Sequence, residues 1–280
     1  TDYETNPAMF HLPEAAVSPA NAQEISDIVK LANEYDFPIT VRSGGTSLAD
    51  GAIPVCGGLV LCMDRLNKII ELNEEGMYMT VEAGVRTIDL QNEAKKVGLM
   101  YAGDPSSAES SLIGGNLATN AGGTQVLCYG TMRDLCLGLE VVLPSGEIWQ
   151  NLNTLRKNNT GYDLKHLFIG AEGTLGLITA AVLKLFPAPK ETQVALIAAA
   201  DLTGIVRSFD VLQRQFDSQL TAFEYITPAA LKLVCTQFGW DLPFPDERSH
   251  VALIEISSAT PHAQLETALQ TQLSLLIEDA

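Results

Sequence analysis

The residues best suited to bind a ligand lie in a short segment, Arg42–Ser47, which reads Arg-Ser-Gly-Gly-Thr-Ser and follows a predicted strand. Gly44 and Gly45 lack Cβ atoms, so their backbone can take positive φ angles and turn several N–H groups toward one point. Thr46 and Ser47 add hydroxyl donors beside them. This combination can hold a phosphate group without any basic side chain.

A lone Gly-Gly pair is also typical of an ordinary turn, and two further segments decide between these interpretations. Residues Ile113–Gly123 and Gly170–Gly176 are again rich in glycine, alanine and small polar residues. Such runs bury little side-chain area, so we interpret them as loops against which an extended ligand lies. The sequence has no Gly-Lys-Ser/Thr loop and no G-x-G-x-x-G after a strand. We therefore predict one large anionic ligand of the dinucleotide kind.

Charge and composition limit the class of protein. The formal net charge is −17, and a surface this acidic repels nucleic acids and anionic lipid headgroups, which bind clustered Lys and Arg. We expect no nucleic acid partner, and an anionic ligand held locally by backbone N–H groups. With 46% hydrophobic and 18% charged residues, the 280-residue chain is expected to be globular, with room for about two domains.

Histidines and cysteines show no pattern typical of a metal site or a disulfide framework. The histidines stand singly, so we predict no metal site within this chain; they are His11, His166, His250 and His262. The five cysteines show no C-x-x-C spacing and are interpreted as small buried residues in a reducing compartment. No apolar run reaches the ~20 residues of a membrane helix. The cytoplasm fits these features best.

The loops need a scaffold of strands and helices, which we expect to fill the first 187 residues. A helix over 22–35 is indicated by an Asn21 cap and apolar residues on one face. A second helix is predicted over 88–96 and a short helical turn over 163–169. The predicted strands are 15–18, 38–42, 59–63, 68–72, 78–82, 139–143, 147–150 and 177–186. Two prolines, Pro187 and Pro189, indicate a boundary there.

The remaining residues alternate strand and helix. Strands are predicted over 193–200, 220–226 and 251–257, and helices over 205–216, 228–238 and 261–277, which indicates an α/β layer with helices on one side. The last helix carries Leu265, Leu269, Leu273 and Leu276 at helical spacing, with no further strand to pack against. We therefore expect the chain to be truncated within this domain.

Taken in order, five segments resemble the FAD-linked oxidases of the vanillyl-alcohol oxidase group. Within that group they are most similar to the branch of D-2-hydroxyglutarate, D-lactate and glycolate dehydrogenases. The segments are Arg42–Leu48, Ile113–Gly123, Gly138–Leu143, Asn159–Lys165 and Leu167–Gly176. The resemblance implies an α+β fold, with a two-subdomain FAD-binding domain of the PCMH type over 1–187 and a truncated α/β substrate (cap) domain over 188–280.

The resemblance also assigns the cofactor-binding residues. It places the FAD pyrophosphate on Ser43, Gly44, Gly45, Thr46 and Ser47. The flavin ring and ribityl chain fall on Asp104, Pro105, Ser110, Ile113, Gly114, Gly115 and Asn120, and the adenosine side on Glu172, Gly173 and Ile178. The set is completed by Leu48, Ala52, Asn116, Gly122, Gly123 and Gly176. Two positions depart from the family pattern, since Ser43 replaces a glycine and Leu112 a common threonine; either could shift the affinity for FAD.

For function, the resemblance implies oxidation of a D-2-hydroxy acid such as D-2-hydroxyglutarate, D-lactate or glycolate to the 2-oxo acid, with hydride transfer to flavin N5. It implies an electron acceptor, which in this group is a quinone, an electron-transfer flavoprotein or an iron–sulfur protein, and it leaves a homodimer open. It also places the protein in the cytoplasm or at the periphery of the inner membrane.

The same resemblance puts the basic substrate-binding residues, and histidine ligands for a divalent metal such as zinc, in a later part of the substrate domain that this chain lacks. We therefore assign no catalytic and no metal-binding residue here. We expect these residues alone to bind FAD weakly or not at all and not to oxidise a hydroxy acid. Two alternatives stay open, another flavin alcohol or sugar oxidase or reductase on the same scaffold, and a noncatalytic nucleotide-binding module.

Overall fold

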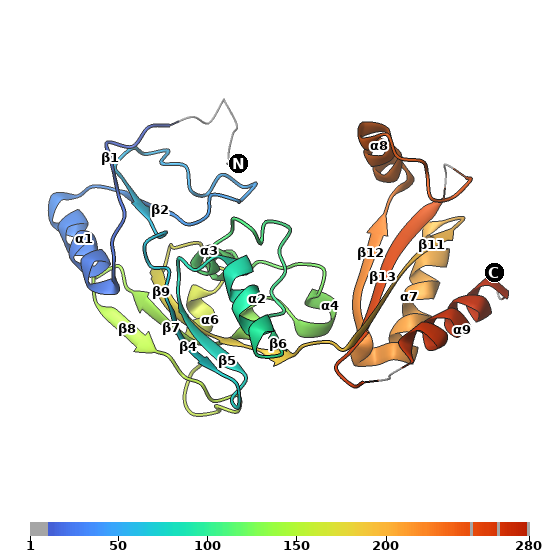
Figure 1. The fold of residues 1–280 in the computed structure, drawn as a ribbon. Helices are drawn as coiled ribbons and strands as arrows, with labels where there is room; N and C mark the ends of the chain where they lie inside the picture. The colour runs from blue at the N-terminus through green and yellow to red at the C-terminus, as the bar shows by residue number, and fades with distance from the viewer. Residues whose placement is uncertain (1–10, 247–248, 262–263, 279–280) are drawn as a thin grey trace. The chain divides into compact units, whose positions relative to one another are not determined.

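The computed structural model describes residues 11–246, 249–261 and 264–278. The chain divides into two compact units (Figure 1). The first contains residues 1–123 and 130–187, and the second contains residues 124–129 and 188–280. The change of unit after Pro187 falls at the expected boundary, but the inclusion of Thr124–Tyr129 in the second unit has no counterpart in the sequence pattern.

The first unit contains a five-stranded antiparallel sheet in the order β4-β5-β9-β7-β8. Its strands are β4 (Ile69–Asn73), β5 (Tyr78–Glu82), β7 (Cys136–Val142), β8 (Ile148–Asn151) and β9 (Leu177–Lys184). The central strand β9 is buried along its middle six residues, because neighbouring strands and helices cover it. This sheet supplies most of the core of the unit.

A smaller parallel sheet stands beside it, in the order β1-β3-β2. Its strands are β1 (Ala15–Val17), β2 (Ile39–Arg42) and β3 (Leu59–Cys62), and β10 (Phe186–Pro187) pairs with β6 (Leu99–Met100) elsewhere in the unit. The mixture of parallel and antiparallel sheets with helices is an α+β fold, as the sequence predicts. Strand β2 ends at Arg42, where the first glycine-rich segment begins.

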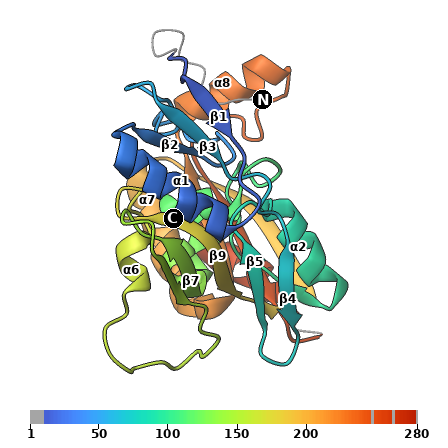
Figure 2. The same cartoon turned by 90° about the vertical axis from the view of Figure 1, so that its left-hand side faces the viewer.

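Helix α1 (Ala22–Tyr35) has the bounds that its sequence predicts. The Asn21 side chain accepts a hydrogen bond from the Glu24 N–H at 2.9 Å, which caps the first turn. Ile25, Val29 and Ala32 are buried on one face, and the helix contacts β7 and β8 (Figure 2). Local signals determine the bounds of this helix, since the cap and the apolar stripe indicate the same residues.

Helix α2 (Thr87–Lys96) is the second longer helix of the first unit. The remaining helices of this unit are short: α3 (Ile113–Ala118), α5 (Met132–Leu135) and α6 (Lys165–Phe168). The prediction that Ile113–Gly123 is a loop is wrong for its first six residues, which form α3. Ile113 and Leu117 are fully buried and anchor this helix, while Gly114 lets it approach Ala83 so closely that an added Cβ would lie 2.7 Å from the Ala83 Cβ.

The second unit is built on an antiparallel sheet in the order β11-β13-β12. The strands are β11 (Glu191–Ala199), β12 (Leu220–Ile226) and β13 (His250–Ser258). Because β11 and β12 are both antiparallel to β13, they run in the same direction and are joined by α7 (Leu202–Phe216) in a split β-α-β arrangement. A turn of 3₁₀ helix, Asp217–Gln219, leads from α7 into β12.

Two helices cover one face of this sheet, α7 and α9 (Leu265–Glu278). They pack on the sheet through a hydrophobic core, which comprises Leu212, Phe216, Leu220, Ile254, Ile256, Leu265 and Leu269. Helix α9 begins at Leu265 rather than at the expected Pro261; His262 and Ala263 lie outside the described residues. The short helix α4 (Val126–Tyr129) also contacts β12 within this unit.

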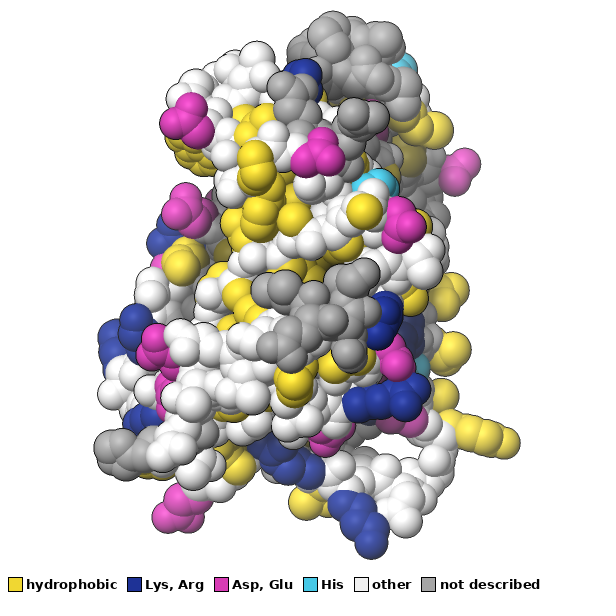
Figure 3. All heavy atoms as spheres, turned by 90° about the vertical axis from the view of Figure 1, so that its right-hand side faces the viewer, with side chains coloured by type: hydrophobic (Ala, Val, Ile, Leu, Met, Phe, Trp, Pro, Cys, Tyr) yellow, Lys and Arg dark blue, Asp and Glu magenta, His cyan; other side chains and the backbone are white. Residues whose placement is uncertain are grey.

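Helix α8 (Pro228–Phe238) is mostly exposed, with Cys235 as its buried residue. Leu233, Phe238 and Trp240 stay largely exposed. Hydrophobic side chains reach the surface on the face drawn in Figure 3, where basic side chains are scattered and form no continuous patch. In the described part of the chain, no helix meets the length and apolarity needed to cross a membrane.

Candidate functional site

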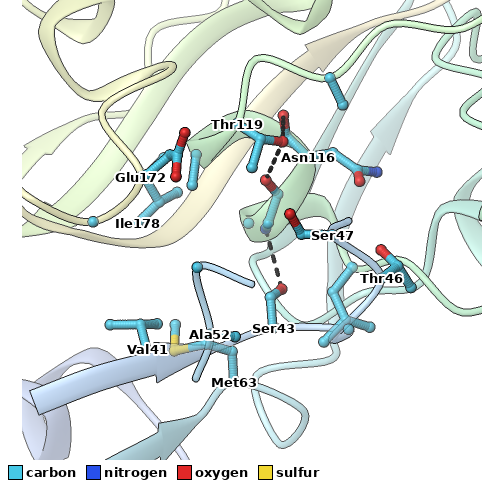
Figure 4. A pocket seen from close by; sticks show the side chains of 18 of the residues that line it. Val41, Ser43, Thr46, Ser47, Ala52, Met63, Asn116, Thr119, Glu172 and Ile178 are labelled. Carbon is cyan, nitrogen blue, oxygen red and sulfur yellow. Dashed lines mark hydrogen bonds between the residues drawn. The ribbon is translucent and has the colours of Figure 1, made fainter. Parts of the chain in front are cut away.

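The first unit contains a cavity of about 250 Å³ on which all three glycine-rich segments converge (Figure 4). Residues of β2 and of the chain after β3 also line the cavity, and the second glycine-rich segment contributes residues of α3. The lining residues are Val41, Ser43–Ser47, Gly51, Ala52, Met63, Pro105, Ser107, Leu112, Gly114–Asn116, Ala118, Thr119, Ala121, Glu172, Gly173 and Gly176–Ile178. Segments about 130 residues apart in sequence, such as 43–47 and 176–178, thus meet at one site.

The first segment is held against α3 by one hydrogen bond and against the chain before α3 by one close approach of the backbone. The Gly115 N–H donates to Ser43 Oγ at 3.1 Å, drawn as a dashed line in Figure 4. A Cβ at Gly44 would lie 2.5 Å from the Ser110 carbonyl oxygen, so only glycine fits there. Gly45 has φ +60°, which an L side chain rarely adopts. Both glycines of the pair are therefore required by the backbone path.

The cavity offers backbone donors rather than positive charge. Its lining contains one charged side chain, Glu172, and no lysine or arginine. Among the described residues, the backbone amides of Gly44, Gly45, Thr46 and Ser47 donate no hydrogen bond to another part of the chain, although Gly45 is buried. Buried backbone N–H groups are normally paired. Such a group of amides matches the oxygen atoms of a phosphate or pyrophosphate.

A buried polar cluster supports the wall formed by α3. The Asn116 Nδ2 group donates to Thr87 Oγ1 at 2.7 Å and to Ser111 Oγ at 3.3 Å. The two hydroxyl oxygens are themselves 2.9 Å apart, and all three side chains are buried. The cluster joins the start of α2 to α3 and to the chain before it, so it fixes the position of the wall that faces the first segment.

Fourteen of the predicted cofactor-binding residues line the cavity. They are Ser43, Gly44, Gly45, Thr46, Ser47, Ala52, Pro105, Gly114, Gly115, Asn116, Glu172, Gly173, Gly176 and Ile178. The other seven predicted residues are not part of the lining. They are Leu48, Asp104, Ser110, Ile113, Asn120, Gly122 and Gly123.

Several of these seven residues have a contact that explains their type without a ligand. Asn120 Oδ1 accepts a hydrogen bond from the backbone N–H of Arg133 at 2.9 Å. A Cβ at Gly123 would lie 1.9 Å from the Asp104 carbonyl oxygen, so this glycine permits two backbone segments to touch. Ile113 is fully buried, whereas Leu48 is 85% exposed.

The sequence interpretation omitted nine lining residues from its set. They are Val41, Gly51, Met63, Ser107, Leu112, Ala118, Thr119, Ala121 and Leu177. Ala118, Thr119 and Ala121 belong to the glycine-rich run 113–123, so their signal was present in the sequence. Val41 and Met63 could not be found in this way. Val41 is an ordinary residue of β2 and Met63 directly follows β3, and the pairing of these two strands makes both residues neighbours of the site.

The fold and the cavity together define the class of protein. An elongated group of backbone amides next to small and aliphatic residues suits a dinucleotide, whose pyrophosphate takes the amides and whose flat rings contact the apolar lining. Apolar groups for such rings are present in Val41, Met63, Leu112, Leu177 and Ile178. The first unit is thus a dinucleotide-binding domain of α+β type.

Comparisons with known proteins identify the family. Residues 13–151 match a family model described as an FAD binding domain. The chain is 44% identical over 196 residues to glycolate oxidase subunit GlcD of Bacillus subtilis, which covers 70% of this chain and 42% of that protein. It is 36% identical over 264 residues to a D-2-hydroxyglutarate dehydrogenase of Xanthomonas citri, which covers 92% of this chain and 55% of that protein.

A solved structure of alkyldihydroxyacetonephosphate synthase has the same fold, with a TM-score of 0.78 and 23% identity over 95% of this chain and 50% of that chain. The chain belongs to the FAD-linked oxidases of the vanillyl-alcohol oxidase group, and its cofactor is FAD. It spans about half the length of the curated relatives it matches.

Adding one methyl group at Gly173 is expected to weaken FAD binding about tenfold, which corresponds to ~1.4 kcal/mol. Gly173 lines the cavity, and its added Cβ would lie 3.9 Å from Leu177 and from Val41, which are also lining residues. The methyl group therefore occupies ligand space without a clash. Equilibrium titration with FAD of the complete protein that carries Gly173→Ala, followed by flavin fluorescence, measures the effect.

Gly161 provides the matched control for this substitution. It has φ +71°, close to the φ +80° of Gly173, and no atom lies within 4 Å of its added Cβ. Both alanine variants should therefore lose a similar ~1–2 kcal/mol of stability through the left-handed backbone, but Gly161→Ala should keep its FAD affinity. Equal FAD affinities in the two variants would show that Gly173 does not face the cofactor.

Proposed function

We propose that the protein that contains this chain oxidises a D-2-hydroxy acid to the corresponding 2-oxo acid. The observation that supports this proposal is the cavity, in which amides and apolar side chains suit FAD, joined to a sequence similar to proteins named as a glycolate oxidase subunit and a D-2-hydroxyglutarate dehydrogenase. D-2-Hydroxyglutarate, D-lactate and glycolate are the candidate substrates within this class.

When bound, FAD supplies a flavin ring that can accept a hydride from the substrate α-carbon. The residues of this chain bind and orient the cofactor. Amides of the segment 43–47 would hold the pyrophosphate, and the apolar lining would exclude water from the ring system. Glu172 is the one charged group of the lining. We assign no base for the substrate hydroxyl and no cation for its carboxylate among these residues.

We further propose that the electrons pass to a separate acceptor, either a quinone, an electron-transfer flavoprotein or an iron–sulfur protein, and that the protein acts in the cytoplasm or at the inner membrane surface. A divalent metal is proposed only for residues outside this chain. Within the described residues, no group of three His, Cys, Asp or Glu side chains could hold a metal ion.

An assay with an electron-accepting dye tests the proposed activity. The complete protein, loaded with FAD, should reduce the dye with at least one of D-2-hydroxyglutarate, D-lactate and glycolate, and should discriminate against the L enantiomers of the two chiral acids. Bound flavin without turnover of any of these acids would contradict the proposal, and a protein that retains no flavin would favour a noncatalytic role. Residues 1–280 alone should show no turnover.

A further inference from the structure

A second cavity in the first unit gathers basic side chains that the proposed function does not use. Its volume is about 230 Å³, and it shares no lining residue with the FAD cavity. Four basic residues line it: Arg133, Arg156, Lys165 and Lys184. The whole chain has 17 lysines and arginines against 34 acidic residues, so a gathering of four around one cavity is a strong local departure from the charge of the protein.

Separate elements bring these cations together. Arg133 belongs to α5, Lys165 and His166 to α6, and Lys184 ends the central strand β9. Arg156 comes from the chain between β8 and α6. Two acidic residues, Asp134 and Asp163, also line the cavity. Four basic and two acidic side chains give the lining a formal balance of +2 with the histidine neutral.

Backbone carbonyl groups hold most of the cationic groups in place. Arg133 Nη1 donates to the His166 carbonyl oxygen at 2.7 Å. Arg156 Nη2 donates to the carbonyl oxygens of Met77 and Leu185 at 3.1 and 3.0 Å. Carbonyl groups orient a guanidinium group but do not neutralise its charge. Because a guanidinium group has five N–H donors, donors of both arginines are also available to a ligand.

The lysines differ in how they are paired. Lys184 Nζ donates to the Asp134 carbonyl oxygen, again a neutral partner, whereas Lys165 forms an ion pair with Asp163. The same Asp163 carboxylate lies 3.1 Å from His166 Nε2, so one carboxylate serves two groups. Three of the four cations therefore have carbonyl partners, which leaves most of the positive charge facing the cavity.

Like charges affect one another in this cavity. Burial lowers the pKa of Lys184, and the positive charges of Arg156 and Lys165 lower it further, although the carboxylate of Asp134 acts in the opposite direction. Such a lowering means that the folded protein holds the lysine proton less firmly, because the amine is partly buried and because other cations are close by. An anion in the cavity would relieve this repulsion.

Two other titratable groups of the lining bear on its net charge. Burial lowers the pKa of His166, and Lys165 and Arg133 add to this, while Asp163 and Asp134 oppose it. Burial raises the pKa of the Cys136 thiol to about 12, so this lining residue stays neutral and adds no negative charge. The cavity is thus positive at neutral pH.

We propose that this cavity binds a small doubly charged oxyanion of the phosphate type, either inorganic phosphate or the phosphate group of a monoester. The charge of such an ion balances the formal +2 of the lining, and arginine and lysine donate well to its oxygen atoms. At ~30 Å³ for each water, the volume has room for one such ion with several waters. Charged and polar side chains make up most of the lining, and Leu137 and Leu155 are its aliphatic members, so the site suits a phosphate group rather than the flat rings of a nucleotide.

The test uses the complete protein, saturated with FAD, so that the FAD cavity is filled and added phosphate cannot bind there. Inorganic phosphate and glycerol phosphate are titrated separately by calorimetry against sodium chloride of equal ionic strength, which controls for general screening. Both oxyanions should bind saturably. The His166 imidazole, observed by NMR and assigned with His166→Asn, should show a pKa that rises on saturation, because a bound anion favours its charged form.

Two charge-removing variants separate a site from a general electrostatic effect. Arg156→Gln should weaken phosphate binding by at least about tenfold. Lys157→Gln makes the same change of charge at the next, exposed residue, which does not line the cavity, and should change the affinity less than about twofold. Both variants should keep the FAD affinity of the parent protein.

Three results would overturn the proposal: no saturable binding of either oxyanion to the parent protein, equal losses in both variants, or a His166 pKa that does not rise on saturation with the oxyanion that binds. The histidine measurement needs no substitution in the cavity, so it decides the question even where Arg156→Gln fails to fold. Binding of glycerol phosphate but not of inorganic phosphate would assign the site to a monoester.

Discussion

The variant Gly44→Ala is expected to lose at least about 100-fold in affinity for FAD, which corresponds to ~2.7 kcal/mol. Its added Cβ would lie 2.5 Å from the Ser110 carbonyl oxygen and 3.0 Å from Ser111 Cα. Backbone atoms cannot rotate away as a side chain can, so the segment 43–47 has to move. That movement displaces the amides that face the cavity. Titration of the purified variant with FAD measures the loss.

The control for this prediction is Gly138→Ala. A Cβ at Gly138 would lie 2.4 Å from the Asn153 backbone nitrogen and 2.5 Å from the Asn151 carbonyl oxygen, so the clash is of the same kind. Gly138 lies on β7 and does not line the cavity. Both variants should lose ~1–3 kcal/mol of stability through overpacking. Similar FAD affinities for the two folded variants would contradict a role for segment 43–47 in FAD binding.

Features of the first unit that depend on neighbouring residues could be predicted from the sequence. Helix α1 has the bounds indicated by Asn21 and the stripe of Ile25, Val29 and Ala32. The boundary after Pro187 follows from its two prolines. The convergence of the three glycine-rich segments was also expected, because one elongated ligand explains why all three lack large side chains.

Features that depend on distant pairing could not be predicted. Val41 and Met63 line the cavity because β2 and β3 form a parallel pair, and nothing in either strand marks it as part of a site. The helix α3 was missed because glycine and alanine hide its pattern; its stability comes from Ile113 and Leu117, which fill the core. Glycine marks close backbone approach as readily as ligand contact, as Gly123 shows.

The second unit repeats this division between local and distant signals. Helix α8 has its predicted bounds, and the Thr227 side chain accepts from the Ala230 N–H at its start. Helix α7 begins at Leu202, three residues before its predicted start, where the Asp201 side chain accepts from the Gly204 N–H. The order of its strands does not follow from the sequence. Strand β13 is last in the chain but central in the sheet, where its apolar residues are covered. The packing of α4 on this unit does not follow from the sequence either, because it depends on residues far apart in the chain. Cys128 Sγ lies 3.1 Å from the Ser218 carbonyl oxygen.

Both cavities of the first unit show how an acidic protein can provide sites for anions. The FAD cavity relies on backbone amides and has a single charged side chain, Glu172. The second cavity concentrates four of the 17 basic residues of the chain. A net charge of −17 repels anions at long range, but short-range donors act within a few ångströms, where screening by water and salt is weakest. Local arrangement rather than net charge therefore decides what binds.

The variant Asn116→Asp is expected to destabilise the first unit by about 3–5 kcal/mol at neutral pH. The Asn116 Nδ2 group donates to Thr87 Oγ1 and Ser111 Oγ, and a carboxylate has no proton to donate in its place. The three side chains are buried, so the new charge loses its hydration. It also stands at the wall of a cavity whose ligand is anionic, so FAD affinity should fall as well.

The stability of this variant should depend on pH in a defined direction. Burial raises the pKa of a carboxyl group in the folded state above its unfolded value. The unfolded chain then gives up the proton first, so the destabilisation is smallest at acid pH and grows as the pH rises through the range between the two values. Urea unfolding of the variant and the parent protein at a series of pH values measures this difference.

Asn120→Asp is the matched control, because it makes the same chemical change four residues away. Asn120 Oδ1 accepts a hydrogen bond from the backbone N–H of Arg133 at 2.9 Å, and a carboxylate oxygen accepts this bond equally well. Its φ of +49° is also one that aspartate tolerates. We expect a change below about 1 kcal/mol with little dependence on pH. A loss as large as that of Asn116→Asp would show that any added negative charge in this region destabilises the unit, and that the buried cluster of Thr87, Ser111 and Asn116 has no special role.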